Sequence, residues 1–352
     1  MGDFDKNCCC TKTQNTFEVK SYTKLNPELR LELKRIKKLL IKPQKGFLDL
    51  SKPSENSNEA RNDLKFLNGF SDILSSDELS EYITAVIVDW NTSSAEISTG
   101  CWKLPKVMAQ KSIVTGVKID QGTVPLFGTY NEMVTQGLDD LHSKCLMLKE
   151  NNCQFTTWKC IFKISNQWPS ALASTANALA AARYASVTQS TGMIPIVHLE
   201  IINLPKATYS IVRALEAHQE ILSSFFSAFN QYHVALESII LMLAIIEPGI
   251  DNAAYHDPCT LADYTSTFLN QLLPPAIPAI ILSATNQHFS HYLNALTQDK
   301  SSKSWKLLFH CLRAPRNSSK NISDDTLMLL EDLHNFFHAH LNIKHENSLS
   351  WD

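Results

Sequence analysis

The segment that decides the fold runs from residue 194 to residue 246 and contains a complete strand–helix–strand unit. It begins with Ile194-Pro-Ile-Val-His-Leu-Glu-Ile201, continues through a helically spaced stretch over 209–231, and ends with Ser238-Ile-Ile-Leu-Met-Leu-Ala-Ile-Ile246. The last run is apolar at every position from Ile239 onward, which is typical of a strand covered on both faces. Two strands joined by a helical crossover are parallel. The unit therefore predicts an α/β fold with a parallel sheet.

The same alternation of short apolar runs and helical segments extends over the rest of the chain. The eight expected strands lie at 46–51, 85–89, 116–120, 158–164, 194–201, 238–246, 276–283 and 305–311. The expected helices lie at 171–189, 209–231, 261–272, 287–296 and 325–341, and another begins with Asn26 as N-cap and Pro27 in its first turn. Eight such units close into a single-domain (β/α)8 TIM barrel. The alternative, an open doubly wound sheet, would want a glycine-rich phosphate turn, but no G-x-G-x-x-G occurs.

The composition excludes several classes of protein. The chain has 352 residues, of which 44% are hydrophobic and 19% charged, and a formal net charge of -3. This balance argues against a nucleic-acid partner bound through a basic face, and against general disorder. The longest apolar run, Ile239 to Ile246, is far short of the ~20 residues that span a bilayer. No secretory signal is recognisable, so we expect a cytoplasmic globular protein without a membrane span.

The first 22 residues are polar, and we expect them to form a disordered tail before a barrel over residues 23–352. Cys8, Cys9 and Cys10 stand together in this tail. They are either simply reduced or palmitoylated beside a myristoylated Gly2, although Lys6 does not fit the myristoylation pattern. The other six cysteines are scattered through apolar segments, and we expect them to be buried reduced thiols. We expect no metal, because no ligand spacing suits one.

Chemistry in a barrel of this kind belongs at the carboxyl ends of the strands. The side chains that stand out there are Ser51, Asp89, Lys118, Asp120, His198, Glu200, Met242, Ser283 and Arg313. Charged groups inside a barrel are costly unless they serve a site, so Lys118 and Glu200 are the first functional candidates. A buried ion pair without activity is the alternative. His198 is either a general base near neutral pH or a packed histidine.

A series of motifs resembles the class I fructose-bisphosphate aldolases in family order. The motifs are Gly116-Val-Lys-Ile-Asp-Gln-Gly-Thr-Val-Pro-Leu-Phe-Gly-Thr129, Thr135-Gln-Gly-Leu-Asp139, Trp158-Lys-Cys-Ile-Phe-Lys-Ile164, Pro169-Ser-Ala-Leu-Ala173, Ala182-Arg-Tyr-Ala-Ser186, Gly192-Met-Ile-Pro-Ile-Val197, His233-Val-Ala-Leu-Glu237 and Trp305 to Arg313. The resemblance implies a (β/α)8 barrel. In active members it also implies retro-aldol cleavage of fructose 1,6-bisphosphate to dihydroxyacetone phosphate and glyceraldehyde 3-phosphate, without a cofactor.

The imine-forming lysine of the resembled family is missing. The family places that lysine after Glu-Gly-x-Leu-Leu, and the matching stretch here is Glu237-Ser-Ile-Ile-Leu-Met242. Only an amine can form an imine with the substrate ketone, and a thioether cannot. No lysine occurs elsewhere on this strand, so a one-residue shift of the alignment does not restore the chemistry.

Other catalytic positions of the resembled family have also lost their charged side chains. The resemblance places Ser51 at the family's first-strand aspartate, with Asp49 two residues earlier on the same strand face, and Thr157 at its second active-site lysine. His198 stands at the acid/base glutamate, while Glu200 keeps the second glutamate of the family's Glu-Pro-Glu. A histidine could still transfer protons, but without an imine there is no intermediate for it to act on.

Binding positions match the family better than catalytic ones. Lys118, Ser283 and Arg313 match a family lysine, serine and phosphate-binding arginine, and Lys159 adds a second amine inside the expected barrel. The Gly-Gly that follows the serine in the family is Ala284-Thr285 here, which adds side chains where backbone N–H groups approach a phosphate. We therefore expect one phosphate or sugar-phosphate group to bind, rather than two.

Three functions remain open at this stage. The chain is a catalytically inactive pseudo-aldolase kept for structure or partner binding, an aldolase that uses another amine such as Lys118 or Lys159, or a sugar-phosphate sensor built on Lys118, Ser283 and Arg313. The first is favoured by the joint changes at Met242, Ser51 and Thr157. The resemblance also implies a homotetramer.

Overall fold

The structure is a computed structural model, and it describes most of the chain between residues 25 and 312. The described residues are 25–42, 45–51, 79–89, 103–202, 204–254, 256–283, 292, 295–296 and 305–312. The expected tail with Cys8, Cys9 and Cys10, the expected helix at 325–341 and Arg313 lie outside these residues. The same holds for most of the expected helix at 287–296.

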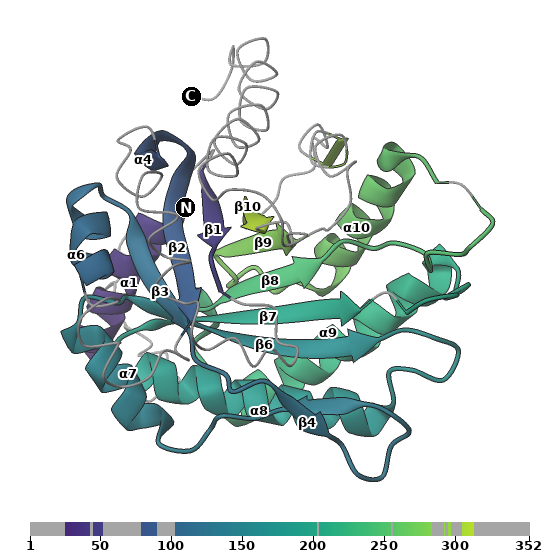
Figure 1. The fold of residues 1–352 in the computed structure, drawn as a ribbon, viewed down its shortest axis with the longest axis horizontal. Helices are drawn as coiled ribbons and strands as arrows, with labels where there is room; N and C mark the ends of the chain where they lie inside the picture. The colour runs from purple at the N-terminus through teal and green to yellow at the C-terminus, as the bar shows by residue number, and fades with distance from the viewer. Residues whose placement is uncertain are drawn as a thin grey trace, which may run out of the picture.

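Eight parallel strands close into a barrel, as the sequence predicts (Figure 1). They are β1 (Gly46–Asp49), β2 (Ile83–Asp89), β3 (Val114–Lys118), β6 (Phe155–Lys163), β7 (Ile194–Ile202), β8 (Ile240–Ala244), β9 (Ala279–Ser283) and β10 (Lys306–Leu312). Their order round the barrel is β1-β10-β9-β8-β7-β6-β3-β2, and β2 pairs with β1 to close it. The single-domain (β/α)8 fold is thereby confirmed.

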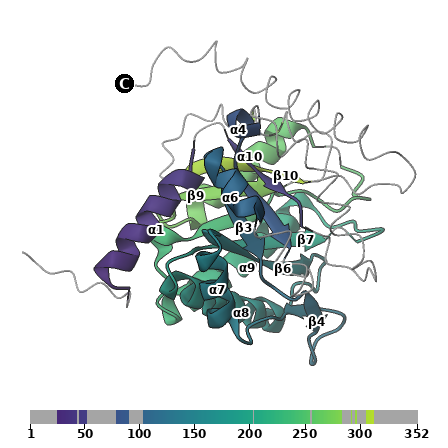
Figure 2. The same cartoon turned by 60° about the vertical axis from the view of Figure 1, so that its left-hand side comes forward.

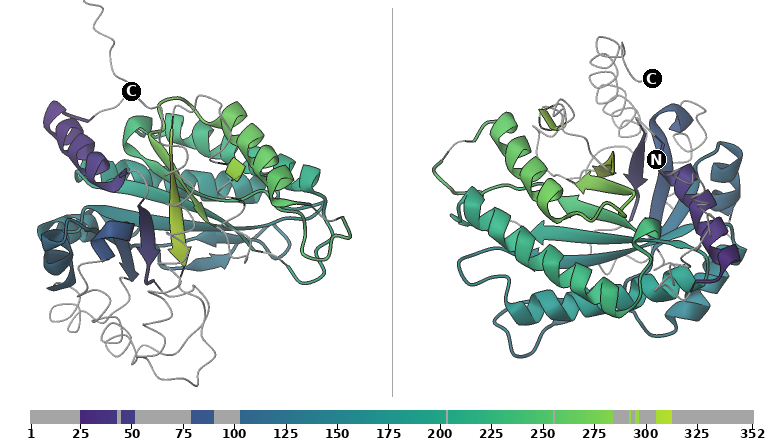
Figure 3. Two further views of the ribbon diagram at one scale, coloured as in Figure 1. Left: turned by 90° about the horizontal axis from the view of Figure 1, so that it is seen from above. Right: turned by 180° about the vertical axis from the view of Figure 1, so that it is seen from behind.

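Helices cover the outside of the barrel. They are α1 (Pro27–Leu40), α4 (Leu79–Tyr82), α6 (Lys103–Gln110), α7 (Leu141–Glu150), α8 (Ala171–Ser190), α9 (Ile211–Gln231) and α10 (Pro258–Leu272), with a 3-10 turn, η2 (Leu236–Ser238), before β8. Figure 3 shows from behind that the long teal α9 and the green α10 run along the strands. A small antiparallel hairpin, β4 (Thr123–Pro125) and β5 (Met133–Thr135), lies between β3 and α7.

Side-chain hydrogen bonds fix where several helices begin. The side chain of Asn26 accepts from the Leu29 N–H at 2.8 Å, so the expected N-cap of α1 is confirmed. Ser170 and Ser210 cap α8 and α9 in the same way. Asp257 caps α10 and is followed by Pro258, which places the start of that helix three residues before the expected Leu261. Each cap satisfies a backbone N–H that the first helical turn leaves unpaired.

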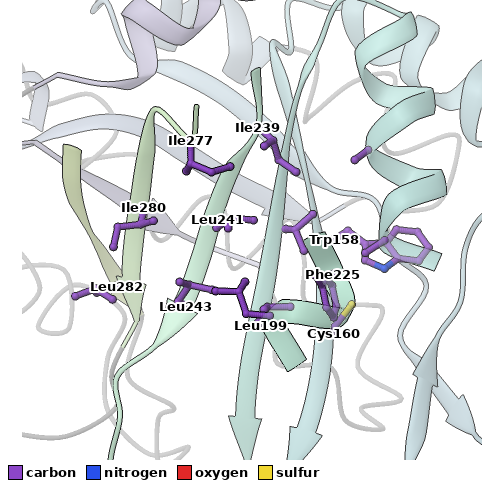
Figure 4. Packing of buried hydrophobic residues seen from close by; sticks show 14 of the residues in the cluster. Trp158, Cys160, Leu199, Phe225, Ile239, Leu241, Leu243, Ile277, Ile280 and Leu282 are labelled. Carbon is purple, nitrogen blue, oxygen red and sulfur yellow. The ribbon is translucent and has the colours of Figure 1, made fainter. Parts of the chain in front are cut away.

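Two apolar layers follow from the alternation of side chains along each strand. Outward-facing residues such as Leu241 and Leu243 on β8 and Ile280 and Leu282 on β9 pack in the layer between strands and helices, where Phe225 of α9 also lies (Figure 4). A second cluster fills the inside of the barrel; its members on the strands are Phe47, Ala85, Ile87, Val114, Phe155, Ile194, Ile196, Ile240, Met242, Ala279, Ile281 and Leu308. The barrel interior is therefore a packed core, with little room for buried charge.

Helix α1 closes the amino-terminal end of the barrel. Its buried residues Leu33, Ile36 and Leu40 belong to the interior cluster rather than to the outer layer. In Figure 2 this purple helix lies outside the ring of strands. Because α1 seals one end with apolar side chains, polar chemistry is confined to the carboxyl end.

The expectation that the six scattered cysteines are buried is wrong for one of them. Cys145, Cys153 and Cys160 are buried and outside any disulfide, whereas Cys259 is an exposed thiol in the first turn of α10. Cys259 is exposed because the buried residues of α10 begin only at Ala262. Burial raises the pKa of the Cys145 thiol to about 11, so this thiol stays protonated.

A buried histidine makes the packing of α9 on α10 sensitive to pH. His218 is 7% exposed, packs edge-on against the Phe268 ring, and its Nδ1 lies 2.7 Å from the Ala214 carbonyl oxygen. Within the described structure its buried Nε2 has no hydrogen-bond partner. Burial lowers the pKa of His218 from 6.5 to about 4, although the bond to Ala214 opposes the shift. Below pH 6.5, His218 therefore becomes protonated in the unfolded chain while it stays neutral in the folded chain.

We expect His218→Phe to remove this pH dependence. Stability that depends on neutral His218 is complete above pH 6.5 and is lost as the pH falls toward 4, by about 2 kcal/mol at pH 5. The variant should therefore gain about 2 kcal/mol over the wild type between pH 7.5 and pH 5, measured by urea unfolding at both values. His142→Phe, at an exposed histidine of α7, is the control. Parallel stability curves for the wild type and His218→Phe would refute the assignment.

Candidate functional site

The strand register brings one set of polar side chains together inside the carboxyl end of the barrel. Lys118 pairs with Thr157, Lys159 with His198, and His198 with Met242 across successive strands. Residues paired in this way share one face of a parallel sheet. Side chains alternate between the two faces along each strand, and the face that carries the interior apolar cluster also carries these polar residues. They therefore point into the barrel, at its carboxyl end. The predicted site residues on β3, β6, β7 and β8 thus lie at one end of the barrel.

Two lysines at this end are each paired with a carboxylate. Lys159 Nζ lies 3.1 Å from Glu200 Oε2, and Lys118 Nζ lies 3.9 Å from Asp120 Oδ1. Each lysine thus has a carboxylate beside it, Glu200 for Lys159 and Asp120 for Lys118. Asp120 also accepts from the backbone N–H groups of Lys159 and Gly122. Burial raises the pKa of Asp120, although Lys118 and these N–H groups oppose the shift.

A second polar group joins β1, β10 and β9. The Nε2 of His310 lies 3.1 Å from Asp49 Oδ2, and its Nδ1 lies 3.3 Å from Ser283 Oγ. The Ser51 N–H donates to the other oxygen of Asp49 at 2.8 Å. Burial alone would raise the pKa of Asp49, but the hydrogen bond and charge of His310, together with the bonds from Ser51, lower it to about 2. Asp49 is therefore a carboxylate at neutral pH.

His198 lies beside this group but is electrically neutral. Its ring centroid is 5.8 Å from that of His310, with the rings nearly perpendicular, and the side chain is 4% exposed. Burial lowers the pKa of His198 well below 6.5, and the positive charge of Lys159 acts in the same direction. A neutral imidazole at pH 7 can accept a proton, but its uptake is unfavourable in these surroundings.

Met242 is sealed into the apolar interior. It is 1% exposed and belongs to the interior cluster, with Ile281 as its register partner on β9. Its other register partner, His198, is the polar neighbour. The position that the resemblance assigns to an imine-forming amine is thus occupied by a packed thioether.

The remaining predicted site residues fall into three groups. Thr157 is buried in β6, while Ser51 follows β1 and Ser283 ends β9, both partly exposed. Arg313, the residue after β10 in the sequence, lies outside the described residues. Glu200 and Lys159 are partly exposed at the mouth of the barrel.

His310 is a site residue that the sequence patterns do not single out. The resemblance directs attention to the arginine three residues later, and a histidine within the run 305–311 resembles a strand residue. The signal in the sequence is a lone histidine among apolar residues. It stands two residues after Leu308, which faces the barrel interior, so His310 is on the same inward face of the strand. Asp49 was noted only as a neighbour of Ser51, yet it is the buried carboxylate of the site.

Over the described ranges, no group of three or more His, Cys, Asp or Glu side chains is placed to hold a metal ion. Among the helices that the structure describes, none is both long enough and apolar enough to cross a membrane.

Comparisons with known proteins agree with this architecture. Residues 32–324 match the family described as "Glycolytic: Fructose-bisphosphate aldolase class-I". The chain is 33% identical over 316 residues to fructose-bisphosphate aldolase C of Homo sapiens, covering 86% of this chain and 85% of that one. It is 33% identical over 299 residues to the fructose-bisphosphate aldolase of Schistosoma mansoni, covering 80% of each.

A solved structure shows the same fold. The fructose-bisphosphate aldolase of Plasmodium falciparum, crystallised with TRAP and a small molecule inhibitor, superposes with a TM-score of 0.72 over 91% of this chain and 94% of its own, at 22% identity. With a match over residues 32–324 and relatives at one-third identity, this chain belongs to the class I fructose-bisphosphate aldolase family.

Proposed function

We propose that this chain is a pseudo-aldolase, unable to cleave fructose 1,6-bisphosphate through an imine and retained as a structural or ligand-binding protein. The observation that carries the proposal is Met242, buried at 1% exposure among interior apolar side chains at the position that the resemblance gives to the imine-forming lysine. Imine formation needs the lone pair of an amine, which a thioether cannot replace.

The other interior amines support the same conclusion. Lys159 is held by Glu200 at 3.1 Å, and Lys118 lies 3.9 Å from Asp120. An ammonium group in an ion pair has no lone pair with which to attack a ketone. Thr157, the register partner of Lys118, stands where the resemblance implies a second lysine. The alternative of an aldolase that works through Lys118 or Lys159 would have to disrupt these pairs.

Ligand binding is the part of the family function for which this site keeps suitable groups. Lys118, Lys159 and Ser283 lie at the carboxyl end of the strands, and we propose that they take one phosphate or sugar-phosphate group together with Arg313. The lysines supply charge and the serine a hydroxyl donor. By the same family resemblance we propose a homotetramer in the cytoplasm, which sedimentation and fractionation would test.

Borohydride trapping tests the pseudo-aldolase proposal directly. The protein is incubated with dihydroxyacetone phosphate and borohydride, and we expect its intact mass to stay unchanged while an active class I aldolase is labelled in parallel. Calorimetry with the same triose phosphate separates binding from chemistry, and Lys118→Ala should weaken any binding while Lys144→Ala on α7 should not. Stoichiometric reduction onto Lys118 or Lys159, located by peptide mass spectrometry, would overturn the proposal.

A further inference from the structure

A chain of two hydrogen bonds crosses three adjacent strands at the carboxyl end of the barrel. β10 lies between β1 and β9, and its His310 contacts Asp49 on one side and Ser283 on the other, at 3.1 and 3.3 Å. A carboxylate, an imidazole and a hydroxyl therefore stand in a row. Neither contact requires an amine, so this group is chemically independent of imine-based cleavage.

The protonation states along this row follow from its partners. Asp49 is ionised, and an ionised carboxylate only accepts hydrogen bonds, so the Nε2 of His310 carries the hydrogen that Asp49 accepts. With the hydrogen on Nε2, an uncharged ring presents the lone pair of Nδ1 to Ser283, whose hydroxyl can donate to it. In this arrangement an imidazole can remove the proton of a serine hydroxyl as that oxygen attacks an electrophile.

The burial pattern supports the same assignment. Asp49 and His310 are 6% and 3% exposed, whereas Ser283 is partly exposed as the last residue of β9. The Ser51 N–H holds the second oxygen of Asp49 and so fixes the carboxylate that faces His310. A base and its orienting group are thus shielded from water, while the nucleophile stands at the open end of the barrel.

The charges around His310 do not oppose this role. His198 packs edge-on against its ring and is kept neutral, while Lys118 and Lys159 are each paired with a carboxylate. Asp49 is the charged group that His310 contacts directly. A proton arriving on Nδ1 would therefore form an imidazolium that Asp49 stabilises.

We propose that Ser283 and His310, positioned by Asp49, form a nucleophilic site that accepts acyl groups from carboxylic esters. Ser283 Oγ bonds to the ester carbonyl carbon while its proton passes to His310 Nδ1. The bond from that carbon to the alcohol oxygen breaks, and His310 returns the proton to the leaving alcohol. Water then attacks the acyl-serine by the same route, which releases a carboxylic acid and restores Ser283.

Covalent labelling of the full chain tests this site. A fluorophosphonate probe should form one phosphorus–oxygen bond per chain at Ser283 with release of fluoride, and p-nitrophenyl acetate should acetylate the same residue, both located by peptide mass spectrometry. Ser283→Ala should abolish both modifications, and His310→Gln should slow them about 100-fold. Ser190→Ala, which removes an exposed hydroxyl bonded to the Val187 carbonyl, should change neither. Absence of label on Ser283, or labelling that His310→Gln leaves unchanged, would overturn the proposal.

The role of Asp49 needs a measurement that a merely structural residue would not affect. Asp49→Asn should slow labelling and move the pH below which the rate falls to a lower value, because the neutral amide no longer favours the protonated ring. The groups that act on the ring are Asp49 itself and neutral His198, beside the paired Lys118 and Lys159. A pH–rate profile identical to that of the wild type would remove Asp49 from the site.

A second variant tests the contact between position 283 and His310 by a different chemistry. In Ser283→Cys, a thiol placed against Nδ1 of His310 should form a thiolate–imidazolium pair, so that iodoacetamide alkylates it below pH 7. Adding His310→Gln should return the alkylation to the pH dependence of an ordinary thiol. Exposed Cys259 in the same sample provides the internal reference. Equal pH dependence at Cys259 and at the new thiol would contradict the proposed contact.

Discussion

Met242→Lys is expected to destabilise the protein strongly without restoring fructose 1,6-bisphosphate cleavage. The new ammonium group would replace a thioether that is 1% exposed inside the apolar cluster with Ile196, Ile240 and Ile281. Burial of this kind depresses a lysine pKa by several units, which corresponds to about 4 kcal/mol or more of lost stability at pH 7. Urea unfolding measures the loss.

The sign of the pH dependence distinguishes a buried charge from poor packing. A lysine that is neutral when folded and protonated when unfolded makes the variant recover as the pH rises toward 10, by up to about 1.4 kcal/mol per pH unit. Met242→Leu, which keeps the volume, should cost less than about 1.5 kcal/mol at every pH. A Met242→Lys deficit that stays constant between pH 7 and 10 would contradict this account.

Activity is expected to stay absent from Met242→Lys because the surrounding groups are those of a different site. Thr157 lies where the resemblance implies a second lysine, and His198 is neutral and buried where it implies a glutamate. A coupled assay for triose phosphate release should therefore give the background rate. Turnover near that of an active aldolase would show that Met242 alone accounts for the loss.

Gly116→Ala is expected to cost about 3 kcal/mol, because no side chain fits at this position of β3. A Cβ on Gly116 would lie 2.3 Å from Cδ2 of Phe155, its register partner on β6. Phe155 is fully buried and cannot yield, since the ring of Phe47 packs against it edge-on at 5.8 Å. The inward face of β3 is therefore open at Gly116 so that Phe155 can fill the barrel.

A double-mutant cycle measures this fit. Phe155→Leu alone should destabilise by removing packed ring atoms, but in the Gly116→Ala background it should recover part of the lost stability. Gly122→Ala is the control, because nothing lies within 4 Å of its Cβ and only its φ of +79° opposes the change. Equal losses of unfolding free energy for Gly116→Ala and Gly122→Ala would show that steric contact is not the cause.

Much of the architecture could be predicted from local patterns. Strands such as β8 and helices such as α9 follow from hydrophobic spacing, which depends on near neighbours in the chain. The boundaries shifted where caps and turns intervene: Asp257 and Pro258 start α10 early, and the 3-10 turn Leu236–Ser238 delays β8 to Ile240. Helices α6 and α7 and the hairpin of β4 and β5 were not anticipated, because they are short.

The family, the barrel and the presence of Met242 in place of a lysine follow from the order of the residues alone. Which polar groups meet, by contrast, depends on the folded barrel. Lys159 pairs with Glu200 on the neighbouring strand, and Asp49 contacts His310 from 261 positions away in the chain. Barrel closure places β1 against β10. Because Asp49 and His310 both point into the barrel from these strands, their side chains come within hydrogen-bonding distance. No local pattern encodes such a contact, because it is created by the closure itself.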